Sequence, residues 1–197
     1  GAFKAYDVRG VYNKDFDKHL VYKVGFFLPE LLGTDHIIVG RDVRTTSDEI
    51  FEHLCKGITD SGADVWNIGL ATTPMVYFAT VHLQAGGSVQ ITASHNPAKY
   101  NGLKISRAMA SPVGVDSGLR ELEEMVKTRE PAPVLVKGKV IDKEVKPDYL
   151  AFLEPFAPNL SGLDISIDCS HGMANLLVKN LLGANHHYLY DHFDGTF

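Results

Sequence analysis

The stretch from Gln90 to Lys104 (QITASHNPAKYNGLK) contains the residues with the clearest potential for chemistry. Ser94 follows an apolar run that ends at Thr92, and Pro97 disfavours helix at the residue before it. The spacing therefore predicts a loop at the end of a strand, the edge where ligands bind to α/β sheets. A serine there can carry a phosphoryl group if cations or a base assist it.

Candidate cations come from several separate segments. His95 adjoins the serine, and the tight turn at Asn101-Gly102 directs Lys104 back toward the same edge. Arg9 lies in the first predicted strand and turn, at 3–12. The alternative is that Ser-His-Asn-Pro is an ordinary turn, in which the serine only caps backbone amides.

A second cluster, Val39 to Ser47 (VGRDVRTTS), lies between a predicted strand and a predicted helix. Exposed amides together with Arg41 and Arg44 suit an anion at such a junction. The alternative is a surface pair between Arg41 and Asp42, with Thr46 opening a capping box.

Strands alternate with helices along the chain, which predicts βαβ units. The expected fold is α/β: a mixed, largely parallel sheet with helices on both faces. Strands are expected at 3–12, 36–40, 64–70, 87–92, 103–106, 163–169 and 188–190, and helices at 16–32, 46–60, 73–83, 116–127, 147–153 and 172–182. Thr73, followed by Pro74, is the expected cap of the third helix.

A proline-bracketed stretch with little helical periodicity, 134–145, is expected to be an irregular β arm between two domains. The first domain would span 1–140 and the second 147–197. The second contains too few βαβ units to close a core, so we expect it to be incomplete.

Composition excludes several classes of protein. The formal net charge of -5 does not favour nucleic-acid binding. No apolar run is long enough to span a membrane, no signal pattern opens the chain, and the two cysteines have no motif spacing, so we expect a cytoplasmic protein. The histidines at 186, 187 and 192 do not converge on a metal-site pattern.

Taken together, these motifs resemble those of the α-D-phosphohexomutase superfamily, in its phosphomannomutase/phosphoglucomutase branch. The active-site serine loop of that family is similar to Thr92–Pro97 followed by Tyr100-Asn101-Gly102 and Lys104. The order of the other matching segments agrees: Tyr6–Gly10, Gly40–Arg44, Thr73-Pro74, Asp168–Gly172 and Asp194–Phe197. His171 stands where the family usually has Asn.

The resemblance implies transfer of phosphate between the 1- and 6-positions of a hexose phosphate, mannose or glucose phosphates being the expected substrates. Phospho-Ser94 would carry the group and supply one ligand to Mg²⁺, and a hexose 1,6-bisphosphate would be the intermediate and activator. Carried over by position, the catalytic residues are Ser94, His95, Lys104 and Arg9, and the substrate- or phosphate-binding residues are Arg41, Arg44, Asn96, Tyr6 and Asn101.

The family's metal-loop, sugar-binding and phosphate-binding domains have no counterpart in these residues. We therefore expect the chain alone to be nearly inactive as a mutase. The alternative from another class is a non-catalytic phosphate-binding or assembly module. An exposed sheet edge in the incomplete second domain could also allow self-association.

Overall fold

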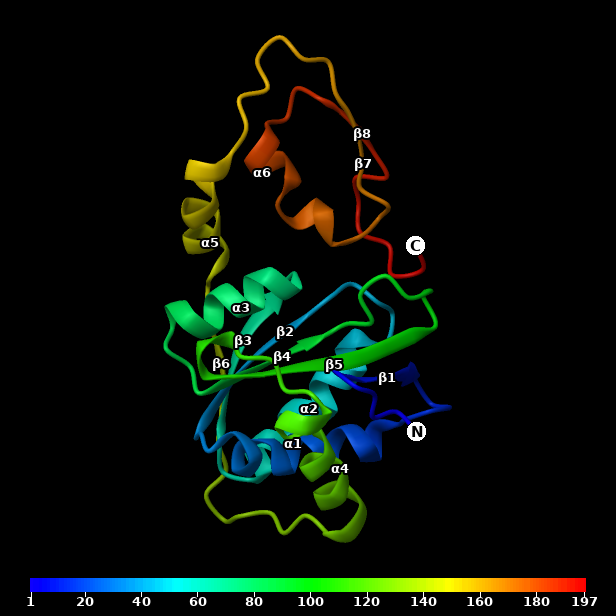
Figure 1. Cartoon of the computed structure of the whole chain (residues 1–197), viewed down its shortest axis with the longest axis vertical. Coiled ribbons are helices and arrows are strands. Elements are labelled where there is room, and N and C mark those ends of the chain that lie inside the picture. Colours follow the sequence, from blue (N-terminus) through cyan, green and yellow to red (C-terminus); the bar gives the residue numbers. More distant parts are fainter.

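The computed structural model describes residues 1–197 and contains a mixed sheet of six strands in the order β1-β5-β4-β2-β3-β6 (Figure 1). The strands are β1 (Val8–Val11), β2 (His36–Arg41), β3 (Asp64–Leu70), β4 (Gly87–Ile91), β5 (Tyr100–Arg107) and β6 (Val140–Asp142). Only β5 runs antiparallel to its neighbours, β1 and β4, while the remaining pairs are parallel. The predicted mixed, largely parallel sheet is confirmed.

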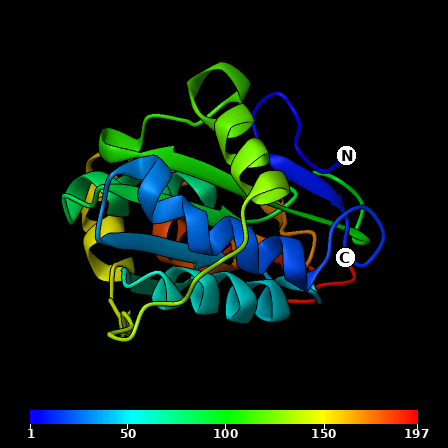
Figure 2. The ribbon, with the colours of Figure 1, turned by 90° about the horizontal axis from the view of Figure 1, so that it is seen from below.

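Helices cover both faces of this sheet, as predicted. They are α1 (Lys18–Leu32), α2 (Ser47–Asp60), α3 (Thr73–His82), α4 (Leu119–Thr128) and α5 (Lys146–Leu153), with short 3₁₀ turns η1 (Ala108–Ala110), η2 (Val115–Ser117) and η3 (Glu154–Phe156). Figure 1 shows α1, α2 and α4 below the sheet and α3 and α5 above it. In Figure 2, which is seen from below, the helices α1, α2 and α4 lie in front of the strands.

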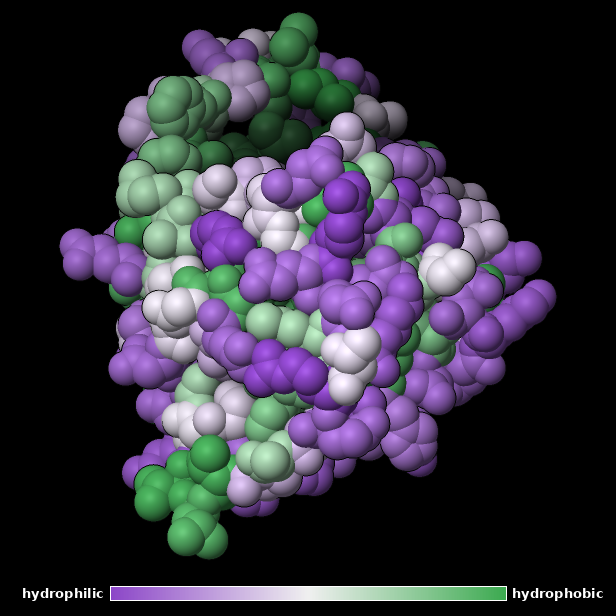
Figure 3. All heavy atoms as spheres, turned by 60° about the horizontal axis from the view of Figure 1, so that its bottom comes forward, coloured by the Kyte–Doolittle hydropathy of each residue, from purple (hydrophilic) through white to green (hydrophobic).

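The larger core lies between the sheet and the lower helices, where 25 buried apolar residues form one cluster. Helices α1 and α2 approach closely because Gly25 and Gly57 meet at their crossing: a Cβ on Gly25 would lie 2.3 Å from the Leu54 carbonyl oxygen. Asp17 caps α1 by accepting a bond from the Leu20 amide at 2.9 Å. Figure 3 shows this side of the molecule, on which hydrophilic atoms predominate.

The smaller core, of 10 buried residues, lies on the other face and joins α3 to the C-terminal part of the chain. Tyr149 on α5 is buried there and packs against Phe78 on α3 with their ring centroids 5.2 Å apart. This contact fixes the start of the C-terminal segment against the sheet domain.

The C-terminal segment contains β7 (Ser166–Asp168), η4 (Met173–Leu176), α6 (Val178–Leu182) and β8 (His187–Leu189), with β7 and β8 forming a separate parallel pair. Large apolar side chains remain exposed in it, among them Phe156 at 73% and Leu163 at 60%. The division at 1–140 and 147–197 stays a prediction. The expected interdomain arm contributes β6 to the first sheet, which therefore continues to Asp142.

Three local predictions were wrong. Thr46 makes no capping bond, because its Oγ1 instead accepts from Asn101. The side-chain cap of α3 is Thr72 rather than Thr73. The helix expected at 172–182 is divided between η4 and α6, which Leu177 separates in a non-helical conformation. None of the helices combines the length and apolar character that a membrane crossing requires.

Candidate active site

Ser94 lies in a tight loop directly after β4, at the C-terminal end of that strand, as predicted. Its side chain is exposed and its φ is +55°, in the left-handed region that residues other than glycine rarely adopt. The Ser94 amide donates to the Thr92 hydroxyl at 2.9 Å, and the Asn96 amide donates to the Ala93 carbonyl at 3.0 Å. The loop thus presents an accessible hydroxyl on a defined backbone.

Arg44 binds this loop from the side of β2. Nη1 donates to the carbonyls of Pro97 and Tyr100 at 2.9 and 3.0 Å. Nη2 donates to the carbonyls of Ser94 and Asn96 at 3.0 and 2.8 Å. Only 2% of the Arg44 side chain is exposed, so it acts here as an internal part of the structure.

Asp42 is the anionic partner of Arg44 and is itself buried. Its Oδ2 accepts from Arg44 Nε at 3.1 Å and from the Thr92 hydroxyl at 2.7 Å. Its Oδ1 accepts from the Arg44 amide and the Ser47 hydroxyl. The alternative of a surface pair between Asp42 and Arg41 does not hold, because Arg41 pairs with Asp48 at 2.6 Å.

Arg9 reaches the serine loop through Asn96, and Lys104 lies beside Arg9 at Asp7. Arg9 Nη1 donates to Asn96 Oδ1 at 2.9 Å, which links β1 to the serine loop. Arg9 Nε and Lys104 Nζ each lie 3.6 Å from Asp7 Oδ2. About a third of the Arg9 side chain and a quarter of the Lys104 side chain are exposed (32% and 26%), so both cations can still meet a solvent-borne anion.

The other predicted residues differ in their placement. His95 is exposed beside Ser94. Asn101 is fully buried, and its Nδ2 donates to the hydroxyls of Thr46 and Ser47. Tyr6 is 80% exposed, and no hydrogen bond joins its side chain to the serine loop.

Arg41 lies outside the loop. Its guanidinium stacks over Phe51 at 4.7 Å from the ring centroid, and its Nε is held by Asp48 on α2. The structure therefore links Arg9 to the serine loop through Asn96, places Lys104 beside Arg9 at Asp7, and directs Arg41 toward α2.

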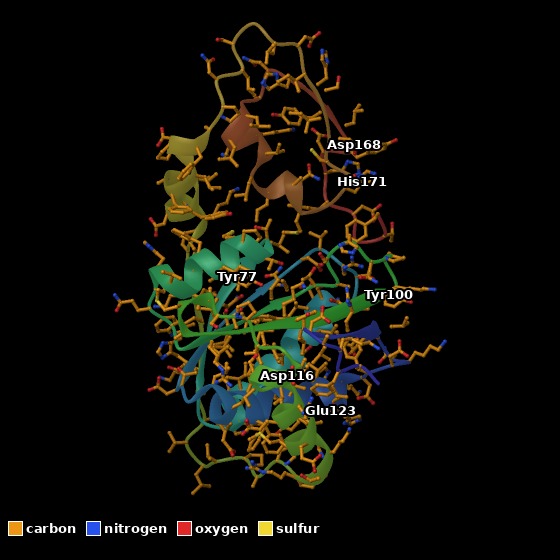
Figure 4. All side chains as sticks on the ribbon, viewed as in Figure 1. Tyr77, Tyr100, Asp116, Glu123, Asp168 and His171 are labelled. Atoms are coloured by element: carbon orange, nitrogen blue, oxygen red, sulfur yellow. The ribbon has the colours of Figure 1, made fainter.

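A cavity of about 830 Å³ lies between the serine loop and the C-terminal segment. From the predicted set, its lining includes Ser94, His95, Asn96 and Arg44. The opposite wall comes from the turn after β7 and from the last residues of the chain, including Asp168, Ser170 and Phe197. Figure 4 shows Asp168 and His171 on the upper segment, above the strand end where Tyr100 lies.

The C-terminal segment also packs on the loop that holds Arg44. The Phe197 ring lies 5.1 Å from the Arg44 guanidinium carbon. A Cβ on Gly195 would approach the Val43 carbonyl oxygen to 2.2 Å, so only glycine permits this contact. The two segments thus meet directly beside the serine loop.

Cys169 lines the cavity but is unsuited to nucleophilic chemistry. Burial raises the pKa of its thiol, and the carboxylates of Asp191 and Asp168 raise that pKa further. A protonated thiol is a weak nucleophile. Ser94 is therefore the better candidate for covalent chemistry in this cavity.

No group of three or more His, Cys, Asp or Glu side chains in the chain is arranged to hold a metal ion. Among the oxygen donors that line the cavity, the Asp168 carboxylate is of the type that a hard cation such as Mg²⁺ prefers. Asp168 Oδ1 already accepts from the amide and hydroxyl of Ser170. Asp168 by itself does not complete a metal site.

Sequence reasoning missed three residues of this network: Asp7, Asp42 as a buried anchor, and Thr92. A signal existed for Asp42, which stands between two arginines directly after a buried strand. Thr92 also marks the strand end, two positions before the serine. Nothing in the sequence separates the buried Asp7 from the exposed Tyr6 beside it.

Comparison with known proteins identifies relatives along the whole chain. Residues 1–132 match the family model for phosphoglucomutase/phosphomannomutase, alpha/beta/alpha domain I. A phosphomannomutase of Klebsiella pneumoniae is 42% identical over 67% of this chain and 84% of its own length. A phosphomannomutase of Salmonella montevideo is 33% identical over 99% of this chain and 45% of its own length.

A solved structure agrees with these matches. The X-ray structure of a phosphoglucomutase/phosphomannomutase family protein from Burkholderia thailandensis superposes with a TM-score of 0.84 at 27% identity, covering 99% of this chain and 45% of that one. The chain thus spans less than half the length of most of these relatives. The family model, the sequence relatives and the fold agree, and the chain belongs to the phosphoglucomutase/phosphomannomutase family.

Proposed function

We propose that this chain is the serine-bearing part of a phosphohexomutase, which interconverts hexose 1-phosphates and hexose 6-phosphates. The observation that carries the proposal is the exposed Ser94 on a loop that Arg9 contacts through Asn96, with Lys104 beside Arg9 at Asp7. Phosphoryl transfer needs positioning and neutralisation of charge, which fixed cations beside a nucleophile provide.

In the proposed step, Ser94 Oγ attacks the phosphorus of a hexose 1,6-bisphosphate. The new Oγ–P bond forms as the bond from phosphorus to the sugar oxygen breaks. The hydroxyl proton leaves Ser94 and a proton reaches the sugar oxygen, with Lys104 or His95 as the carrier. Arg9 would neutralise the phosphoryl oxygens during the transfer.

Mg²⁺ would add positive charge at the transferring group when it binds, with phospho-Ser94 as one oxygen ligand. This chain's own contribution is to present that oxygen and to hold the flanking cations. Roles for Arg41, Tyr6 and Asn101 in binding substrate stay predictions.

The proposal is tested by intact-mass measurement and peptide mapping after incubation with glucose 1,6-bisphosphate or mannose 1,6-bisphosphate. We expect a gain of about 80 Da, one phosphoryl group, localised to Ser94. Ser94→Ala should remove it. A chain that binds the bisphosphate in calorimetry but never becomes phosphorylated would favour the alternative, a non-catalytic phosphate-binding module.

Complete turnover is a separate question, because the relatives extend well beyond the matched residues. We expect little conversion of glucose 1-phosphate by this chain alone in a coupled assay. Turnover close to that of a full-length relative would contradict the proposal that other domains complete the site.

We also propose that the C-terminal segment can self-associate. Its two-stranded sheet has free edges, and Leu189 on β8 is 52% exposed. Light scattering over a range of concentrations tests this, and a monomer at every concentration would overturn it.

A further inference from the structure

Ser94 adopts a backbone conformation that a serine would not choose by itself. A left-handed φ of +55° is disfavoured for a residue with a Cβ, and it persists only where surrounding contacts compensate. The loop also contains the exposed His95 and Pro97, which supply no core packing. Hydrogen bonds, including several from outside the loop, must therefore hold Ser94 in place.

Arg44 supplies most of these contacts. An arginine side chain has five N–H donors. In this structure Nε donates to Asp42, Nη1 to two carbonyls and Nη2 to two more, one of them that of Ser94 itself. Every donor is used within the protein, and the side chain is almost completely buried. A substrate phosphate could bind Arg44 only by displacing the loop that carries the nucleophile.

A second line of contacts reaches the amide side of Ser94. Asp42 Oδ2 accepts both Arg44 Nε and the Thr92 hydroxyl. The Thr92 oxygen in turn accepts the Ser94 amide at 2.9 Å. Ser94 is thus held at its carbonyl by Arg44 directly and at its amide through Asp42 and Thr92, and these contacts oppose rotation of the peptide units on both sides.

We infer that Arg44, together with Asp42 and Thr92, is a positioning residue that fixes the Ser94 backbone, in place of the phosphate-binding role predicted for it. The inference rests on the proposed function for its catalytic meaning, since the fixed backbone aims the hydroxyl that would accept the phosphoryl group. The Arg9 and Lys104 side of the loop is left to bind the phosphate.

Three variants separate this role from phosphate binding. Thr92→Val removes the hydroxyl link at nearly constant volume, Thr92→Ser keeps it, and Arg44→Lys cannot bind all four carbonyls. Arg129→Lys is the matched control, because Arg129 pairs with Glu30 through both Nη atoms on the surface. Two readouts are needed: amide hydrogen exchange at Ser94, and the rate of Ser94 phosphorylation as a function of bisphosphate concentration.

For Thr92→Val and Arg44→Lys we expect exchange at the Ser94 amide to be about tenfold faster or more, as for a lost hydrogen bond. The maximal phosphorylation rate should fall about tenfold or more, while the half-saturating bisphosphate concentration stays within about twofold. Thr92→Ser and the Arg129→Lys control should match the wild type in both readouts.

Other outcomes overturn the inference. An increase in the half-saturating concentration for Arg44→Lys, with an unchanged maximal rate, would make Arg44 a phosphate ligand. Unchanged amide exchange in both variants, even with a lower melting temperature, would reduce the network to ordinary packing. If the wild-type chain is never phosphorylated, the proposed function fails for this chain, and hydrogen exchange alone decides whether the network fixes Ser94.

Discussion

The two cationic sides of the serine loop are built differently. On the side of β2, Arg44 is buried, is paired with Asp42 and donates to four backbone carbonyls. On the side of β1, Arg9 and Lys104 share one carboxylate at 3.6 Å and keep part of their surface in solvent. Both sides look alike in the sequence, as basic residues in or beside predicted strands.

The difference separates architecture from chemistry. A cation whose donors are all satisfied inside the protein stabilises a conformation, and its removal leaves buried partners unpaired. A cation that retains free donors and solvent contact can instead neutralise an incoming phosphate. Stability should therefore depend mainly on the β2 side of the loop, and phosphoryl transfer mainly on the β1 side.

The largest effect is expected for Asp42→Asn, which removes the charge from the buried pair with Arg44. An uncompensated buried guanidinium should lower the free energy of unfolding by about 3–5 kcal/mol. Chemical denaturation measures this directly. A loss below about 1 kcal/mol, the range of an exposed ion pair, would show that the β2 side is not the structural one.

Lys104→Met tests the β1 side. The methionine retains an unbranched apolar side chain, so stability should change little, while phosphorylation of Ser94 should slow about 100-fold. Lys127→Met is the control, because the exposed Lys127 side chain forms an ion pair with Glu123 on the same helix, α4. The contrast between the two sides would be contradicted if Lys104→Met and Lys127→Met slowed Ser94 phosphorylation equally. A large loss of stability in Lys104→Met would also contradict it.

Asp60 provides a structural ion cluster far from the loop for comparison. Burial would raise its pKa, but Lys137, Lys56 and the Tyr22 hydroxyl outweigh burial and lower the pKa to about 2 from the usual 3.8. The folded state therefore holds its proton less tightly. The stabilisation is complete above about pH 4 and is lost as the pH falls toward 2, with a size of about 2 kcal/mol.

Measuring unfolding free energy against pH checks this, with Asp60→Asn as the reference variant that lacks the carboxylate. The wild-type curve should converge toward the curve of this variant at low pH. Parallel curves from pH 5 to pH 2 would contradict the lowered pKa.

The smallest effect is expected for Asp7→Asn. Asp7 is buried with one oxygen near both cations and the other without a partner. Loss of its charge should strengthen bisphosphate binding by a few-fold while lowering the maximal rate of phosphorylation by up to about tenfold, because Lys104 loses its anchor. Saturation kinetics measure the affinity for the bisphosphate and the maximal rate separately. A weaker affinity for the bisphosphate in Asp7→Asn would show that Asp7 has another role.

Local pattern was enough to predict most of the fold. The strand at 64–70 and the alternation of strands with helices follow from apolar periodicity and from turn residues, which act over a few positions. The position of Ser94 in a loop after β4 follows in the same way, because Pro97 disfavours helix at the residue before it. Thr46 was predicted wrongly because a partner 55 positions away, Asn101, competes for its hydroxyl.

The sequence by itself determined the alternation of elements, the serine loop at a strand end and the resemblance to a family. Only the tertiary structure decided which arginine contacts the serine loop and which packs on α2. Arg41 and Arg44 stand three positions apart, yet one lies over Phe51 and the other binds carbonyls more than 50 positions away in the chain. Side-chain direction at a strand end depends on which elements pack there, and no local pattern encodes that packing.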